Sequence, residues 1–223
     1  GAAATDNDNV AIGYNALLLA DGGASNTAVG STAANALTSG DNNTALGFNA
    51  LGAAQTVADN VAVGKDALAA NVAAQTTAVG SSALAALNDA LAVGNVAVGY
   101  QALLTANSAT AIGNTAVGHS ALTAATTSAS NTAVGYQAAD AVTTGAQNTA
   151  MGRGALSAAA TVADNTAIGF NALTANVAAQ ITAVGSGALA ALDNAAAVGN
   201  TAVGYNALTT ANNTGAIGNT AVG

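Results

Sequence analysis

The sequence contains no cysteine, proline or tryptophan, and charged residues make up only 5% of its 223 residues. Without cysteine, disulfide bonds cannot hold the fold together. Aromatic residues make up 3% of the chain, whereas apolar residues make up 52% and are dominated by alanine. Large apolar side chains supply most of the area that a globular core buries. This composition is therefore typical of a thin structure with a narrow interior.

Positive charge is nearly absent, because Lys65 and Arg153 are the only permanent cations and the net charge is −8. A nucleic-acid binder needs a basic surface to replace the counterions of the phosphates. Anionic membrane surfaces are disfavoured for the same reason. No run of 18 apolar residues occurs, and the start of the sequence does not read as a secretory signal. We expect no nucleic-acid partner and no membrane insertion in this segment.

What the sequence has in abundance is one phrase, x-Ala-aliphatic-Gly, which recurs along the whole chain. The steps between its glycines are 17, 17, 17, 16, 14, 5, 14 and 5 residues, and the same eight steps then repeat, giving a superrepeat of 105 residues. When each pair of 14 and 5 is merged, the coils are 16–19 residues long. The glycines that define these coils, predicted as structural turn residues, are Gly13, Gly30, Gly47, Gly64, Gly80, Gly99, Gly118, Gly135, Gly152, Gly169, Gly185 and Gly204.

The register predicts three segments: a lead-in at residues 1–9, a first superrepeat at 10–114 and a second at 115–223. The chain stops on Gly223 in mid-phrase, without the atypical capping repeat that closes natural solenoids. We therefore expect a window from a longer repetitive protein, folded as one continuous rod.

The phrase Thr-Ala-Val alternates with a period of two and is rich in β-branched residues, which favours a short strand. The asparagine before it and the glycine after it are turn formers. A repeat of short helices is the alternative, since residues 82–94 are rich in helix formers, but two helical turns are marginal alone. The prediction is an all-β fold, a parallel β-solenoid of about 12 coils stacked at about 4.8 Å.

The 19-residue coils carry the phrase twice, for example at Ala90–Gly99 and Ala109–Gly118. This doubling suggests two strand edges in one coil, with Asn95 or Asn114 at the corner.

The phrases Asn9–Ala16 (NVAIGYNA) and Asn26–Ala33 (NTAVGSTA) resemble the head repeats of trimeric autotransporter adhesins, and related phrases occur in phage and bacterial surface fibres. The resemblance implies a left-handed parallel β-roll and a homotrimer with an aliphatic face on its threefold axis. It also implies an extracellular or cell-surface location. The coils are longer here than in that family, and a longer coil can also close its own core as a monomer.

The residue directly after each coil glycine is the one that varies most, and it holds every aromatic residue and every Lys, Arg and His of the chain. One interpretation is a linear contact strip for a host-surface protein or glycan. The other is a roomy outward corner of the coil. The candidate binding residues of this column are Tyr14, Phe48, Lys65, Tyr100, His119, Tyr136, Arg153, Phe170 and Tyr205.

Other chemistry finds little support. His119 is the only histidine, and no Cys or Glu accompanies it, so we expect no metal site, no cofactor and no enzyme activity. Asp59 and Asp164 recur in TVADN, without the glycine spacing of calcium-binding solenoids, and are interpreted as solvated turn carboxylates. Threonine fills eleven of the seventeen positions three residues before a phrase glycine. That face suits ice binding if it is exposed, but its mixture with Val and Ile favours packing against another chain.

Taken together, the sequence predicts a structural and adhesive segment of an extracellular fibre, a homotrimer that attaches to surfaces through many weak contacts. The alternatives are a phage tail-fibre shaft, a filament that assembles end to end with itself, and an ice-binding β-solenoid.

Overall fold

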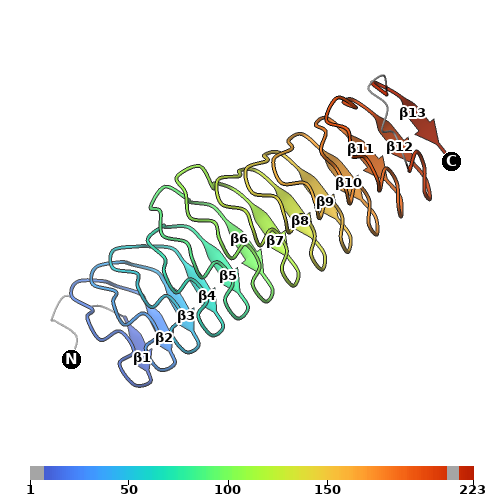
Figure 1. Cartoon of the computed structure of the whole chain (residues 1–223). Helices are drawn as coiled ribbons and strands as arrows, with labels where there is room; N and C mark the ends of the chain where they lie inside the picture. Colours follow the sequence, from blue (N-terminus) through green and yellow to red (C-terminus); the bar gives the residue numbers. More distant parts are fainter. Residues whose placement is uncertain (1–7, 210–215) are drawn as a thin grey trace. The chain divides into compact units, whose positions relative to one another are not determined.

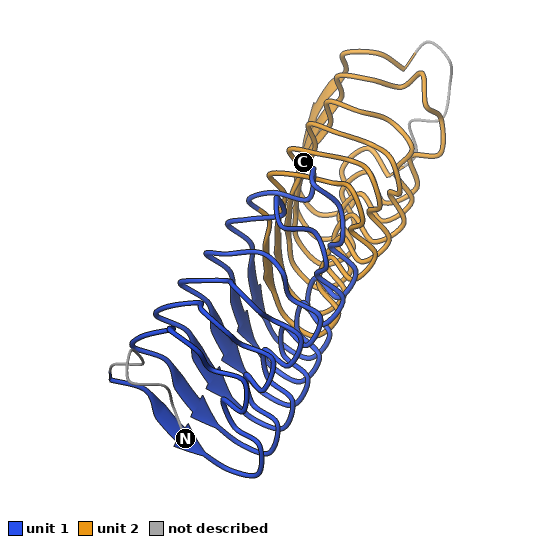
Figure 2. Cartoon of the chain, turned by 90° about the vertical axis from the view of Figure 1, so that its left-hand side faces the viewer, with its two compact units in different colours: residues 1–113 blue, residues 114–223 orange. Residues whose placement is uncertain are grey.

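The computed structural model describes residues 8–209 and 216–223. The regular secondary structure of these residues consists of short β-strands, and they contain no helix. The chain forms two compact units, residues 1–113 and 114–223, which Figure 2 shows in blue and orange. The strands of the first unit are β1 (Val10–Ile12), β2 (Thr27–Val29), β3 (Thr44–Leu46), β4 (Val61–Val63), β5 (Thr77–Val79) and β6 (Val96–Val98). Those of the second are β7 (Thr115–Val117), β8 (Thr132–Val134), β9 (Thr149–Met151), β10 (Thr166–Ile168), β11 (Thr182–Val184), β12 (Thr201–Val203) and β13 (Thr220–Val222).

Within each unit the strands pair in parallel and in the order of the sequence, one strand per coil (Figure 1). The register matches equal positions of the repeat: Val10 pairs with Thr27 in the first unit, and Thr115 with Thr132 in the second. Each unit is therefore a parallel β-solenoid, and the predicted all-β fold is confirmed. The helical alternative is wrong, because residues 82–94 form turns and bends.

Each strand turns its central alanine inward. Ala28, Ala45 and Ala116 are completely buried, whereas the flanking Thr and aliphatic residues lie on the outer side. Successive side chains of a strand point to opposite faces, so a three-residue strand has one inner position. A methyl group fills that position in every coil, which explains why the core is so narrow.

The largest core side chain of most coils comes from a leucine with a left-handed backbone. Leu51, Leu68 and Leu156 have φ values of 55°, 50° and 55° and no exposed surface. This conformation costs about 1–2 kcal/mol for an ordinary residue. Bonds between coils compensate for it, since the amide of Leu51 donates to the carbonyl of Ala67 at 2.9 Å. Leucine suits the position because it has no branch at Cβ.

The glycine after each strand is required twice over. Gly47 has φ +135°, which side chains with a Cβ rarely adopt. A Cβ built on it would also lie 2.6 Å from the carbonyl oxygen of Gly64 in the next coil. The stacked backbones approach too closely there for any side chain.

In most coils the residue before the strand is an asparagine, and between the end coils these asparagines form a buried ladder. In the second unit, Oδ1 of Asn148 accepts hydrogen bonds from the backbone amide and the Nδ2 of Asn165, both at 3.1 Å. Its own Nδ2 donates to Oδ1 of Asn131 and to the carbonyl of Val162. The same pattern links Asn26, Asn43 and Asn60 in the first unit. The prediction that these asparagines serve as turn formers is wrong: the left-handed residue is the one before them, such as Asp164 with φ 60°.

In the doubled phrases at residues 90–99 and 109–118, the first phrase forms no strand and the second does, which corrects the expectation of two strand edges. Residues 91–93 lie in a turn that the Asp89 carboxylate closes by accepting from the amide of Leu91 at 3.0 Å. The backbone amide of Gly113, in the next coil, donates to the carbonyl of Val93 at 3.1 Å. Asn95 therefore does not stand between two strands; its Nδ2 donates to the carbonyls of Ala92 and Ala111.

Candidate functional site

The residue after each coil glycine points outward. The glycine turns the chain away from the strand, and the next side chain leaves the coil before Ala and Leu re-enter the core. All nine candidate residues of this position are exposed: Tyr14, Phe48, Lys65, Tyr100, His119, Tyr136, Arg153, Phe170 and Tyr205. We call this position the outward column. The parallel register within each unit places its members one strand spacing apart, about 4.8 Å.

In the second unit, four members of the outward column contact one another in sequence. The rings of His119 and Tyr136 stack with centroids 5.1 Å apart and 25° between their planes. The Cζ of Arg153 lies 5.8 Å from the Tyr136 ring centroid and 5.5 Å from that of Phe170. These separations are within the range of cation–π attraction, so the guanidinium sits between two aromatic rings from the coils on either side.

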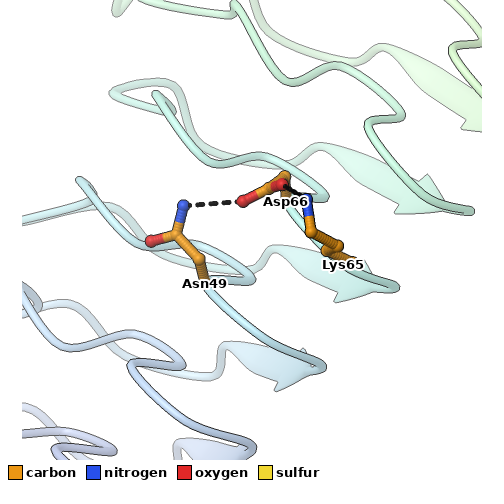
Figure 3. A network of polar contacts seen from close by, with 3 residues as sticks. All are labelled: Asn49, Lys65 and Asp66. Atoms are coloured by element: carbon orange, nitrogen blue, oxygen red, sulfur yellow. Dashed lines mark hydrogen bonds and ion pairs between the residues drawn. The ribbon is translucent and has the colours of Figure 1, made fainter.

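In the first unit, a shorter version of this arrangement has a different electrostatic character. The Nζ of Lys65 lies 5.9 Å from the Phe48 ring centroid and forms an ion pair with the Asp66 carboxylate. Asn49, from the preceding coil, donates its Nδ2 to the same carboxylate at 2.9 Å (Figure 3). The hydrogen bond from Lys65, followed by that from Asn49, holds the pKa of Asp66 below its ordinary value. The charge of Lys65 is therefore balanced locally.

Two tyrosines of the column, one near each end of the described chain, are the most exposed of its aromatic residues. Tyr14 and Tyr205 are 74% and 76% exposed. Serine takes the column position in the coils between, at Ser31, Ser81 and Ser186. The structure brings Phe48 and Lys65 together in the first unit, and it joins His119, Tyr136, Arg153 and Phe170 in the second.

A second exposed surface is the outer side of the strands, which we call the strand face. In each coil it carries a Thr or Val at the first strand residue and an aliphatic residue or Met at the third. In the second unit all seven strands begin with Thr. Met151 and Ile168 are about two-fifths exposed on this face. It is a flat, uncharged surface on a regular lattice of strands.

The buried asparagine ladder is the feature that sequence reasoning missed. Its signal was present, because asparagine recurs four residues before the glycine in most coils. The same spacing suits a turn residue, and only the contacts between coils distinguish the two. Asp140 was also overlooked: burial raises its pKa above the ordinary value, and its Oδ1 is buried without a hydrogen-bond partner in the structure.

Among residues 8–209 and 216–223, no three or more His, Cys, Asp or Glu side chains gather closely enough to hold a metal ion. In the same residues, no helix is long and apolar enough to cross a membrane. Comparison of the chain with protein-family models, with curated proteins and with solved structures found no match.

Proposed function

We propose that the chain is a structural and adhesive segment of an extracellular fibre, in which three copies associate through the strand face. The observation that carries the proposal is the outward column. Every aromatic and every permanent cation of the protein occupies one exposed position of a repeated coil. A rigid scaffold that presents such side chains at fixed intervals supports attachment through many weak contacts acting together.

The scaffold suits a mechanical role. Backbone hydrogen bonds join each coil to its neighbours on several sides, and the asparagine ladder adds buried bonds through the interior. To extend either unit, these bonds would have to break coil by coil. Because each coil contacts only its neighbours, stability is a sum of coil and interface contributions.

The strand face supports the trimer because it carries no charged residue, and its side-chain polar groups are threonine hydroxyls, which can pair with those of a second copy on burial. One coil supplies only about 50 Å² of it, from three strand residues with a rise of about 3.3 Å each and a strand spacing of about 4.8 Å. Stable interfaces bury about 800 Å² per partner. Association must therefore draw on many coils at once, and it should strengthen with their number.

Light scattering on the chain at several concentrations tests this assembly. We expect a molar mass of three chains that dissociates only on strong dilution. The variant Met151→Glu places a charge on the strand face and should yield monomers with an unchanged circular dichroism spectrum. Thr144→Glu, at an exposed position away from the strand residues, is the matched control and should remain trimeric. A wild-type monomer at all concentrations would exclude the trimer.

Ice binding is the second candidate, and the unbroken series of threonines at β7–β13 favours it. Such a face would work as a monomer, with its strand spacing matched to a crystal surface. Thermal hysteresis of the wild-type chain that is lost in Thr149→Leu would support this function, and its absence would remove it.

A further inference from the structure

The two permanent cations of the chain sit in the same column but in opposite electrostatic settings. Lys65 is paired with Asp66, the next residue of its coil. The residue in the corresponding position after Arg153 is Gly154, and no carboxylate of the described residues lies within ion-pair distance of Arg153. Arg153 therefore presents a positive charge that its own coil does not balance.

The aromatic neighbours of Arg153 restrict the position and orientation of its guanidinium group. The guanidinium lies between the Tyr136 and Phe170 rings at 5.8 and 5.5 Å, and His119 stacks behind Tyr136. A guanidinium held between two rings keeps its N–H groups at the edge of the stack, where they match the two oxygens of a carboxylate. Less side-chain freedom is lost on binding than for a mobile surface arginine.

The charge distribution along the chain favours the same place. The first unit carries seven aspartates and one lysine, a net charge of −6, whereas the second carries three aspartates and one arginine, a net charge of −2. Long-range repulsion of an anion is therefore weaker around Arg153 than around Lys65.

We infer that Arg153, together with Tyr136 and Phe170, forms a binding site for a carboxylated sugar of an acidic polysaccharide. The guanidinium would bind the carboxylate, and the exposed parts of the two rings would contact the C–H face of the sugar ring. A polysaccharide is a linear series of sugar rings, and the outward column is a linear series of side chains, one from each coil. This inference deepens the adhesive role proposed above by naming its ligand class, and it rests on that proposal.

The test measures binding of fluorescently labelled oligogalacturonate, oligomannuronate and hyaluronan oligomers, at low salt, to the intact chain. The methyl ester of oligogalacturonate is the control, since it has the same rings without the charges. We expect at least one acid to bind, and binding to weaken with salt and with esterification. No binding of any of the three acids at millimolar protein, or equal binding of ester and acid, would overturn the inference.

Variants locate the site. Arg153→Gln should weaken binding about tenfold or more, since charge-assisted bidentate bonds are the strong class of hydrogen bond. Arg153→Lys should recover only part of it. Gly154→Asp installs the carboxylate that Asp66 supplies beside Lys65, at a left-handed residue (φ +65°). The added Cβ would lie 2.5 Å from Oδ1 of Asn171, so the end of that side chain must rotate away. This variant should abolish binding without altering Arg153. Thr144→Glu is the matched control: it lowers the net charge by one, as Arg153→Gln does, but at an exposed residue outside the outward column, and it should bind as the wild type does.

The chain also permits a gain-of-function test. Asp66→Asn removes the carboxylate from Lys65 but keeps an oxygen that can accept from Asn49. It should create a second, weaker site for the same acid. Unchanged binding in both Arg153→Gln and Gly154→Asp would overturn the assignment to Arg153. Equally tight binding of poly-glutamate would overturn the sugar specificity, because charge alone would then be recognised.

The molar mass from light scattering separates the two proposals. Trimers that bind none of the acids would leave the fibre standing and refute only the ligand. Monomers whose binding is lost in Arg153→Gln would refute the trimer and support the site.

Discussion

Removal of one ladder asparagine should destabilise the solenoid more than its small size suggests. Asn148 is 1% exposed, and its side chain makes four hydrogen bonds: two donated by Nδ2, to Asn131 and Val162, and two accepted by Oδ1 from Asn165. A net contribution of about 1 kcal/mol per bond gives about 4 kcal/mol. Asn148→Ala also leaves the buried amide of Asn165 without its acceptor, so we expect a loss of about 3–6 kcal/mol after local relaxation.

The assay combines urea denaturation with amide hydrogen exchange, because solenoid unfolding need not be two-state. Exchange of the Asn165 amide should accelerate strongly in Asn148→Ala, since that amide donates to the deleted oxygen. The Asn131 amide, which donates to Asn114 instead, should change much less.

Asn176→Ala is the matched control. Asn176 is also fully buried, but its two hydrogen bonds both join it to Ala178 in its own coil. We expect a cost of about 1–2 kcal/mol and little effect on neighbouring coils. A loss below about 1 kcal/mol in Asn148→Ala, or unchanged protection of the Asn165 amide, would refute the view that the ladder couples coils.

Three further outcomes follow from particular residues. Gly47→Ala should lower the melting temperature sharply, because its Cβ would meet the Gly64 carbonyl at 2.6 Å. The control Gly113→Ala has φ +66° and no atom within 4 Å of the added Cβ, so it should lower the free energy of unfolding by only about 1 kcal/mol. Equal effects of the two variants would contradict the close stacking of the coils. Asp140→Asn should raise the melting temperature at neutral pH, because burial raises the pKa of Asp140 and stability is lost as pH rises through that value. The advantage should vanish below the ordinary value of 3.8, and a constant advantage at all pH values would rule out this cause. Because the pKa of Asp66 is lowered, its ion pair with Lys65 stabilises the folded chain above pH 3.8, and this contribution disappears as pH falls through the pKa of the folded state. In Lys65→Gln, an NMR titration should show the pKa of Asp66 moving back toward 3.8.

The repeat predicted much of this molecule, because equal residues at equal intervals must stack on one another in a solenoid. The strand positions follow from the alternation of Thr, Ala and Val, and the inward alanine follows from its invariance. The outward column could be recognised for the opposite reason. A position that accepts Tyr, Lys, Ser and Arg in successive coils cannot lie in a core that elsewhere admits only a methyl group.

The errors concern residues whose role depends on the neighbouring coil. Asparagine is both a turn former and a hydrogen-bonding side chain, and the spacing before the strand suits either. The first phrase of the doubled pair, at residues 91–93, has the composition of a strand, yet Asp89 turns the chain there and no strand forms. Leu51 and its equivalents look like ordinary helix or strand formers, and nothing local indicates their left-handed backbone.

The sequence by itself determined which residues are equivalent, because stacking in register is the only way to bury so much alanine in coils of nearly constant length. The tertiary structure alone decided how those equivalent residues act. It placed the asparagines in the interior, where each must find its partners on the next coil, and it set Arg153 between two aromatic rings of neighbouring coils. These contacts join residues about 17 positions apart, over distances of 3–6 Å that no spacing along the chain encodes.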